Sequence, residues 1–360
     1  MTEKVRWGIL STANIALTKV IPGMQRSSWC EITAIASRDL ARARESADAL
    51  GIPNAYGSYE ELLLDDSVEV FYNPLPNHLH VPWILKAAAA GKHVLCEKPI
   101  ALNAEEARAL IDARDRYGVR IQEAFMVRTH PQWLETRTLI RSGRIGKLRS
   151  ITGFFSYFNP DPENIRNQLE LGGGALMDIG CYPITMSRFI FEAEPRRVLG
   201  LIERDPVFGT DTLTSAVLDF EQGQSTFTCS TRLAPYQRMI FHGTEGRIEV
   251  LIPFNAPNDR PTQILLDEET VEIPVCDQYE VQGTLFSQAL RENRQQPIPL
   301  EDAINNMAVI DAVFRSAANS QWEDLQSYKS CKSCNPVPHL DRIYKILQNL
   351  QELISQGAPS

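Results

Sequence analysis

Long apolar runs are absent from this sequence. No stretch reaches the about 18 apolar residues that a membrane-spanning helix needs, so we expect no membrane partner. The first apolar run, 5–10, is too short for the core of a signal peptide, and no small-residue cleavage site accompanies it. These absences predict a cytoplasmic protein.

An excess of positive charge is also absent. Lys and Arg number 36 against 45 Asp and Glu, which gives a net charge of -9 at pH 7. Because nucleic-acid binding needs a basic face, this balance argues against a nucleic-acid partner. Hydrophobic residues make up 43% and charged residues 22%, which is typical of a folded, globular chain. We expect a small, neutral or weakly polar substrate in a local pocket.

A disulfide framework and a metal-ligand cluster are missing as well. The seven cysteines are odd in number and most lie within apolar runs, as reduced thiols in a cytoplasmic protein do. Cys331 and Cys334 form a C-x-x-C near the C-terminus, but no second pair or histidine cluster accompanies them. His78 and His80 have no third ligand nearby. The sequence therefore predicts no metal site.

The first 126 residues alternate apolar strands with helices. Strands are expected at 5–10, 32–37, 68–73, 93–96 and 119–125. Asp39 and Asn103 precede helical stretches that end at Gly51 and Gly118, as N-caps and C-terminal glycines do. This alternation predicts βαβ units and a doubly wound parallel sheet, an α/β Rossmann domain over 1–126.

From about residue 147 the pattern changes to strands joined by short turns. Strands are expected at 151–158, 197–203, 213–220, 225–231, 239–242, 247–251 and 263–266, and one helix, 175–191, interrupts them. The pattern predicts an α+β domain over 127–323 with an open, mainly antiparallel sheet. Two late helices, 281–293 and 300–320, can pack back on the Rossmann half. The tail, 324–360, holds one amphipathic helix that docks on the body or contacts another subunit.

The loop after the first strand has few of the glycines of a dinucleotide-binding loop. It reads Gly8-Ile9-Leu10-Ser11-Thr12-Ala13-Asn14-Ile15-Ala16. Against the pattern G-x-G-x-x-A, Ser11 and Ala13 stand where glycines are usual. Small residues still let backbone N–H groups approach a pyrophosphate, and the two hydroxyls add donors. We predict a nicotinamide dinucleotide held by Ser11, Thr12, Ala13, Asn14 and Ile15.

The end of the second strand indicates which dinucleotide fits. An acidic residue there would bind the ribose 2′-hydroxyl of NAD and repel a 2′-phosphate. Ser37 and Arg38 stand there instead, followed by Asp39. Ser37 can donate to a phosphate oxygen, and Arg38 can pair with the phosphate and stack on the adenine. These residues favour NADP over NAD, the alternative being that Arg38 is solvated and Asp39 only caps a helix.

Two further loops lie at the carboxyl edge of the predicted sheet, where ligands bind in such folds. The third strand leads into Asn73-Pro74-Leu75-Pro76-Asn77-His78-Leu79-His80. Pro76 can wall the cofactor pocket, His80 lies near the site, and Asn77 borders the pocket or caps the next helix. The fourth strand ends in Cys96-Glu97-Lys98-Pro99, and a lysine fixed between an acid and a proline is unusual for a loop.

At Glu97-Lys98-Pro99 the sequence resembles the glucose–fructose oxidoreductase and inositol dehydrogenase (Gfo/Idh/MocA) family, over about residues 4–323. Other matching stretches are GILSTANIA, PLPNHLH, FMVRTHPQ (125–132), GGGALMDIGCYPI (172–184) and HGTEGRIEV (242–250). The glycine-rich stretch and NIR (164–166) are similar to the branch that contains NADP-dependent xylose and glucose dehydrogenases and dihydrodiol dehydrogenase. The tail after Trp322 has no counterpart in that family.

The resemblance implies an activity and a site. The family's catalytic positions fall on Lys98, Asp178 and Tyr182. The implied activity is hydride transfer between a nicotinamide and a CH–OH or C=O group of a sugar or related polyol, typically NADP-dependent oxidation of D-xylose or D-glucose. The implied fold has one sheet face over the active site and the other available for a homodimer or homotetramer.

These residue types suit alcohol oxidation, in which a hydride leaves carbon and a proton leaves oxygen. Tyr182 would carry the proton, and its phenolate needs a nearby cation because tyrosine titrates near pH 10. Lys98 supplies that cation or is itself the immediate proton donor. Asp178, four residues before Tyr182, orients Lys98 or binds a sugar hydroxyl.

Several roles stay open at this stage. Arg128 and Arg166 hold cofactor or substrate, or form surface salt bridges, and Glu97 positions Lys98 or touches the nicotinamide ribose. A keto- or anhydro-sugar reductase, or a dihydrodiol dehydrogenase, would use the same residues. A protein that binds NADP(H) only as a sensor is the non-enzyme alternative, and the complete set of catalytic residues counts against it.

Overall fold

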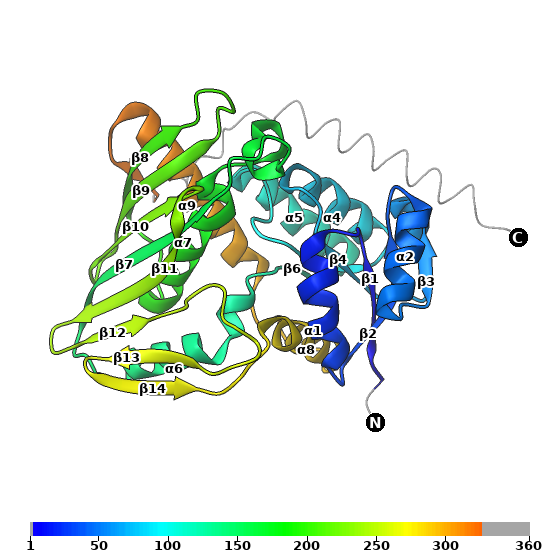
Figure 1. Ribbon diagram of the computed structural model, residues 1–360, viewed down its shortest axis with the longest axis horizontal. Coiled ribbons are helices and arrows are strands. Elements are labelled where there is room, and N and C mark those ends of the chain that lie inside the picture. Colours follow the sequence, from blue (N-terminus) through cyan, green and yellow to red (C-terminus); the bar gives the residue numbers. More distant parts are fainter. Residues whose placement is uncertain (1–2, 326–360) are drawn as a thin grey trace, which may run out of the picture.

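The computed structural model describes residues 3–325, so the predicted tail helix and the C-x-x-C at 331–334 lie outside the described residues. Within these residues the N-terminal lobe is a six-stranded sheet in the order β3-β2-β1-β4-β5-β6 (Figure 1). Its strands are β1 (Val5–Ile9), β2 (Cys30–Ala36), β3 (Asn54–Tyr56), β4 (Val70–Asn73), β5 (His93–Cys96) and β6 (Ile121–Glu123). All neighbouring pairs are parallel, which confirms the predicted Rossmann arrangement.

Helices connect these strands. They are the π-helical turn η1 (Ala16–Val20) leading into α1 (Ile21–Arg26), α2 (Leu40–Leu50), α3 (Tyr59–Leu63), the 3-10 turn η2 (Asn77–Leu79) leading into α4 (His80–Ala89), and α5 (Ala104–Tyr117). Asp39 caps α2, and Asn103 caps α5, by accepting from backbone N–H groups of the first turn. Gly51 and Gly118 end the same helices with φ of 66° and 64°, a conformation that glycine adopts without strain.

The C-terminal lobe is a nine-stranded sheet, counted within residues 3–325, in the order β14-β13-β12-β11-β7-β10-β9-β8-β15. Its strands are β7 (Leu148–Phe158), β8 (Arg197–Arg204), β9 (Asp211–Asp219), β10 (Gln224–Ser230), β11 (Arg232–Gly243), β12 (Arg247–Val250), β13 (Thr262–Leu266), β14 (Glu269–Ile273) and β15 (Glu323–Asp324). The sheet is mixed and mainly antiparallel, because β10 runs parallel to β7 while the other neighbours are antiparallel.

The remaining helices cover this sheet and join the lobes. They are η3 (Met126–Thr129), α6 (Pro131–Arg141), η4 (Ile165–Asn167), η5 (Leu169–Leu171), the π-helical turn η6 (Leu176–Gly180) continuing into α7 (Cys181–Phe191), α8 (Gln278–Arg291) and α9 (Leu300–Asn319). Helix α8 lies beside α1 (Figure 1), and its Ser287 Oγ accepts from Trp7 Nε1 of β1 at 3.1 Å. Helix α9 contacts α5, because Asp311 Oδ2 accepts from the Ala104 backbone N–H at 2.9 Å.

Several short elements were missed from the sequence. They are β3, α3, α6, β14 and β15, and β11 is longer than the predicted 239–242. Helix α6 carries Thr136 and Thr138, and β-branched residues lower helix propensity. Tertiary packing overrides that preference, because the buried Trp133 ring packs edge-on against Phe241 with centroids 5.9 Å apart.

One apolar core runs through both lobes. Buried residues from β5, β6, β7, β10 and α9 belong to a single cluster, and a second cluster surrounds β1 and includes Trp7 and Phe286. The site between the lobes therefore rests on a continuous packed base. Among residues 3–325, no helix is long and apolar enough to cross a bilayer.

Candidate active site

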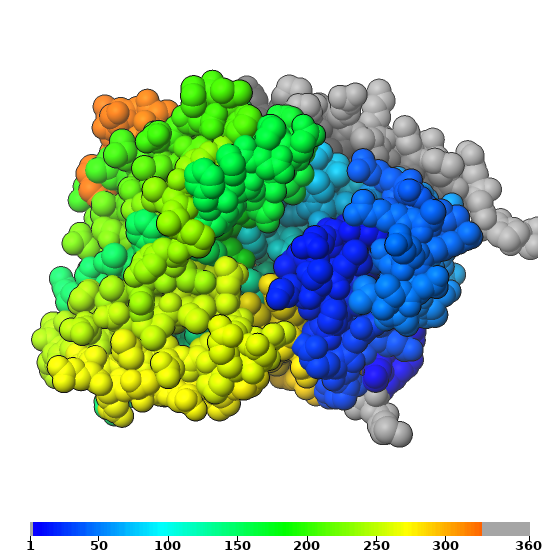
Figure 2. Space-filling model, viewed as in Figure 1, coloured from blue at the N-terminus to red at the C-terminus, as the bar shows by residue number. Residues whose placement is uncertain are grey.

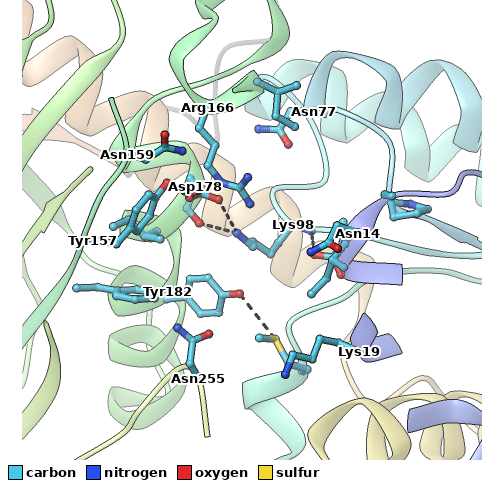
Figure 3. Close-up of a pocket in the computed structure, with 18 of the residues that line it drawn as sticks. Asn14, Lys19, Asn77, Lys98, Tyr157, Asn159, Arg166, Asp178, Tyr182 and Asn255 are labelled. Carbon is cyan, nitrogen blue, oxygen red and sulfur yellow. Dashed lines mark hydrogen bonds and ion pairs between the residues drawn. The ribbon is translucent and has the colours of Figure 1, made fainter. Parts of the chain in front are cut away.

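A cavity of about 940 Å³ lies between the lobes. The surface in Figure 2 is hollowed between the dark blue N-terminal segment and the green and yellow segments of the second lobe. The Rossmann wall includes Asn14, Lys19, Asn77 and Lys98, and the opposite wall includes Tyr157, Asn159, Arg166, Asp178, Tyr182 and Asn255 (Figure 3). The fold thus brings together the three predicted catalytic residues, although 80 positions separate Lys98 from Asp178.

Lys98 follows β5, and Asp178 holds its ammonium group. The Nζ atom is 2.6 Å from the Asp178 backbone oxygen and 3.2 Å from Oδ1, and the two side chains are 11% and 13% exposed. Burial lowers the pKa of Lys98, but the Asp178 carboxylate more than offsets this and the pKa is raised. Lys98 is therefore an ammonium. Within the described residues Asp178 engages two of its three N–H groups, which leaves one for an oxygen in the cavity.

Asp178 receives two further donors. The Tyr157 hydroxyl, from β7, donates to Oδ2 at 2.6 Å, and Arg166 Nε, from η4, donates to the same oxygen at 2.8 Å. Burial would raise the pKa of Asp178, but Arg166 and Lys98 hold it well below its usual range. Burial and the Asp178 charge both raise the pKa of Tyr157. Because both carboxylate oxygens are committed within the protein, the geometry favours orienting Lys98 over binding a sugar hydroxyl.

Tyr182 is the second residue of α7 and is 5% exposed. The ring packs edge-on against Phe125 and Phe155, and Lys98 Nζ lies 4.9 Å from its centroid. Burial raises the pKa of Tyr182 well above its usual value. The ammonium lies over the Tyr182 ring, and stabilisation of the phenolate by Lys98 stays a prediction. Among residues 3–325 the hydroxyl's partner is Met126 Sδ at 3.7 Å, a weak acceptor that a substrate oxygen can replace.

The helix that carries Asp178 and Tyr182 is anchored by a residue that sequence reasoning missed. Asp211, from β9, accepts from the Leu176 backbone N–H at 2.6 Å and from Thr214 Oγ1 at 3.0 Å. Gly174 has φ of 122°, and a Cβ there would lie 2.0 Å from Asp211 Oδ1. Gly174, the last glycine of the run 172–174, therefore makes room for the anchor of this helix.

Three residues of the β4 and β5 loops have structural partners. Glu97 Oε1 accepts from the Tyr72 hydroxyl at 2.6 Å, and its Oε2 accepts from the Lys98 backbone N–H at 3.3 Å, which fits the role of positioning Lys98. Asn77 does not cap a helix, since its Nδ2 donates to the Gly172 backbone oxygen at 2.8 Å. His80 is completely buried with each ring nitrogen against a backbone carbonyl, so in the described structure it offers no nitrogen to a cofactor.

The loop after β1 fits a dinucleotide. It lies at the centre of the parallel sheet, between β2 and β4, and Ala13, Asn14 and Ile15 line the cavity. Ser11 Oγ accepts from the Ala13 backbone N–H at 3.1 Å, so the serine closes a turn at a position where glycine is usual. The helical run begins at Asn14, and the N–H groups of a first turn have no helical partner and attract phosphate. Lys19 adds a cation to the same wall.

Other predicted cofactor residues lie beyond the cavity lining. These are Ser11, Thr12, Ser37, Arg38 and Pro76. Ser37 directly follows β2 and is 7% exposed, whereas Arg38 is exposed. Asp39 Oδ1 accepts from the N–H groups of Ala41 and Arg42, which is the helix cap expected for this residue.

Arg128 lies outside the cavity lining and forms a salt bridge, one of the two alternatives expected for it. Its Nη1 pairs with Asp302 of α9 at 2.6 Å, and Asp302 also pairs with Arg188 of α7 at 3.1 Å. The group is buried away from the cavity lining and joins η3, α7 and α9. Arg166, the other predicted arginine, does line the cavity and pairs with Asp178.

Two family models match this chain, one in each lobe. Residues 5–125 match the family described as "Oxidoreductase family, NAD-binding Rossmann fold", and residues 133–249 match the "GFO/IDH/MocA C-terminal domain". Together the two matches cover most of the chain and both walls of the cavity.

Individual relatives are similar over nearly their whole length. An uncharacterized oxidoreductase of Rhizobium meliloti is 49% identical over 331 residues, which is 89% of this chain and 99% of the relative. D-xylose 1-dehydrogenase (NADP(+)) 2 of Haloferax volcanii is 38% identical over 319 residues, 86% of this chain and 97% of the relative. Among solved structures, KijD10, a 3-ketoreductase from Actinomadura kijaniata in complex with NADP and TDP-benzene, superposes with a TM-score of 0.82 at 30% identity, covering 87% of this chain and 98% of that one.

Proposed function

Because this chain belongs to the GFO/IDH/MocA oxidoreductase family, we propose that it is an NADP-dependent dehydrogenase of a sugar or related polyol. The proposed substrate is an aldose such as D-xylose or D-glucose, oxidised at its CH–OH group. The likeness to a D-xylose 1-dehydrogenase that uses NADP supports this choice. A cavity lined by amide, hydroxyl and guanidinium groups suits a ligand with many hydroxyls.

The observation that carries the proposal is the pairing of Lys98 with the Tyr182 hydroxyl at one cavity. Lys98 is a held ammonium with an N–H to spare, and Tyr182 has a hydroxyl whose present partner is only a sulfur among the described residues. A reacting oxygen placed between them would accept a hydrogen bond from Lys98 Nζ and exchange its proton with Tyr182 Oη. Bound NADP would supply the hydride acceptor. Asp178 keeps Lys98 charged and aimed throughout.

The cofactor preference rests on the end of β2. Ser37 and the exposed Arg38 directly follow that strand, and Asp39 Oδ1 caps α2. A guanidinium that pairs with a 2′-phosphate typically contributes about 1.5–3 kcal/mol. Arg38→Ala is therefore expected to raise the KM for NADP by at least about tenfold and to leave the KM for NAD unchanged.

A second candidate is the reverse reaction, reduction of a keto-sugar. The specific observation in its favour is that burial raises the pKa of Tyr182, so the residue rests as a phenol that is ready to donate a proton. The structural likeness to a ketoreductase agrees with this.

The oligomer is proposed to form through the outer face of the nine-stranded sheet. That face holds a second cavity of about 520 Å³, which includes Phe154, Leu199 and Leu201, and Leu201 is 75% exposed. An apolar sheet face of this kind is typical of an interface between subunits. Leu201→Glu should convert a homodimer or homotetramer to a smaller species in sedimentation velocity.

One assay decides among these functions. Purified protein is mixed with a panel of aldoses and either NADP or NAD, and absorbance of the reduced nicotinamide is followed. Faster reduction of NADP than of NAD by xylose or glucose is the expected result. No reaction with the aldoses, but oxidation of NADPH by keto-sugars, would replace the dehydrogenase with the reductase. Cofactor binding without turnover of either panel would indicate the NADP(H) sensor.

A further inference from the structure

The backbone directly after Lys98 is held by two buried ionisable side chains. The Pro99–Ile100 peptide unit presents its carbonyl to His80, whose Nδ1 lies 2.8 Å from Pro99 O. It presents its N–H to Glu123, whose Oε1 accepts from Ile100 N at 2.7 Å. Both ends of one peptide unit are therefore engaged, from α4 on one side and from β6 on the other.

Neither side chain touches the cavity through a free polar group. Glu123 is 1% exposed, and its Oε2 has no hydrogen-bond partner in the described part of the chain. His80 is fully buried, and its Nε2 lies 2.7 Å from the Leu75 backbone oxygen. An isolated buried carboxyl group and a buried imidazole are costly to maintain, which calls for a reason. Their shared contact with one peptide unit supplies it.

His80 also connects the two loops that flank the cavity. Leu75 lies in the loop after β4, and Pro99 in the loop after β5, and both Leu75 and Lys98 line the cavity. A neutral imidazole donates to one of the two carbonyls, and an imidazolium donates to both. In either state the buried ring bridges the two loops, because its nitrogens lie against one carbonyl of each.

Glu123 is suited to holding an N–H in an apolar setting. Burial raises the pKa of Glu123 to about 8, so at neutral pH the group is a neutral carboxylic acid whose carbonyl oxygen can still accept from Ile100. Lys98, Asp302 and Arg188 are the charged groups that act on it, and none of them forms a hydrogen bond to it among the described residues. The acid therefore fixes the backbone without drawing the Lys98 ammonium away from Asp178.

We propose that His80 and Glu123 are positioning residues for Lys98, which grip the Pro99–Ile100 peptide unit and thereby aim the Lys98 side chain at the reacting oxygen. The inference rests on the proposed oxidoreductase function. A displacement of about 1 Å at a catalytic group can lower the rate about 100-fold. Holding the peptide unit next to Lys98 in place therefore offsets the cost of burying the two polar side chains.

The test replaces each gripping group by methionine, which is similar in size and cannot form the bond. In Glu123→Met, kcat is expected to fall about 10–100-fold while the KM for sugar changes by less than about threefold, because the lost contact acts on the aim of Lys98. Deuterium exchange of the Ile100 amide should become faster. Glu123→Gln keeps an acceptor oxygen and should restore both kcat and the protection of that amide. His80→Met should lower kcat in the same way.

Matched controls separate positioning from general destabilisation. Gln122 directly precedes Glu123 on β6 and is equally buried. Because side chains alternate along a strand, Gln122 points to the other face of the sheet. His93 is a half-buried histidine at the opposite end of β5 that accepts from Arg120 N. Gln122→Met and His93→Met should lose stability to urea without the loss of kcat.

Two results would overturn the proposed positioning role. A Glu123→Met variant with a freely exchanging Ile100 amide and near-native kcat would overturn the proposal, as would an equal loss of kcat in Gln122→Met. If Glu123→Met does not fold, Glu123→Gln and His80→Met test the proposal through the same two measurements, kcat and exchange of the Ile100 amide. If the wild-type protein turns over no sugar in either direction, the proposed function fails. In that event unchanged exchange of the Ile100 amide in Glu123→Met would still disprove the grip.

Discussion

Two of the tyrosines that line the cavity, Tyr157 and Tyr182, have hydroxyl groups in opposite situations. Tyr157, on β7, donates to Asp178 Oδ2 at 2.6 Å in a group that also contains Lys98 and Arg166. Tyr182, at the start of α7, is surrounded by aromatic rings, and its hydroxyl contacts only the sulfur of Met126 within residues 3–325. Both have a raised pKa, one chiefly through burial beside a carboxylate and the other through burial among rings.

This difference between the two hydroxyl groups shows that burial alone does not identify the residue that carries the proton. A hydroxyl bonded to a permanent carboxylate has given its proton to that bond and must break it before it can react. A hydroxyl beside a weak acceptor can turn to a substrate oxygen at little cost. We therefore assign proton transfer to Tyr182 and electrostatic support of Asp178 to Tyr157, and the predictions that follow test this division.

Removing the Tyr182 hydroxyl should produce the largest effect. Tyr182→Phe keeps the ring packing but leaves no proton carrier at the reacting oxygen, so kcat is expected to fall about 10²–10⁴-fold. Cofactor binding, measured by fluorescence of the reduced nicotinamide, should be unchanged. A variant that keeps more than about a tenth of wild-type kcat would contradict the assignment.

Neutralising Asp178 should come next. In Asp178→Asn the charge that chiefly raises the Lys98 pKa is lost, and the lysine keeps only neutral oxygen acceptors, so its charge and its orientation are held less firmly. We expect kcat to fall about 100-fold, the lower end of what losing one charged donor to a reacting oxygen costs. Asp205→Asn breaks a similar ion pair, to Arg232, away from the cavity lining and serves as the control. Equal losses in both variants would reduce Asp178 to a stabilising role.

The three proposed catalytic residues could be located from the sequence, whereas the residues that support them in the fold could not. Lys98, Asp178 and Tyr182 stand within short stretches that resemble a family, so local reading found them. Tyr157 lies among alternating aromatic residues that read simply as a strand, and only the folded sheet places it against Asp178. Glu123 and Asp211 likewise act on backbone groups 23 and 35 residues away along the chain.

Long-range pairing also decides what the sequence leaves open. For Arg128 the alternatives are cofactor or substrate binding and a salt bridge, and the structure shows a salt bridge. Its partner, Asp302, is 174 residues away on α9. The expected stabilisation of the Tyr182 phenolate by Lys98 stays a prediction. Residue types gave the correct neighbours, but the face of the ring that Lys98 approaches depends on the packing of Phe125 and Phe155.

The rate of oxidation should rise about tenfold per pH unit, whereas the rate of reduction should not change with pH. Burial raises the pKa of Tyr182, so below that pKa the phenolate needed for oxidation grows about tenfold per pH unit, and kcat/KM for oxidation should rise accordingly from pH 7 to 9. The phenol needed for reduction stays fully populated over this range, so the reduction rate should be flat. Initial rates in both directions check this. A plateau in the oxidation rate near pH 7 would mean that another group carries the proton.

Tyr157→Phe should have the smallest effect on turnover. It tests the same comparison of the two tyrosines by removing the hydroxyl that is not expected to carry the proton. Asp178 keeps Lys98 on Oδ1 and Arg166 on Oδ2, so we expect kcat to fall by less than about tenfold, with a loss of stability to urea of about 1–2 kcal/mol from the missing hydrogen bond to a charged group. The slope of the oxidation rate against pH should match that of the wild type, because Tyr182 is intact. Should Tyr157→Phe instead lose as much activity as Tyr182→Phe and abolish the pH slope, the proton would pass through Tyr157 and Asp178. The free hydroxyl of Tyr182 would then serve packing alone.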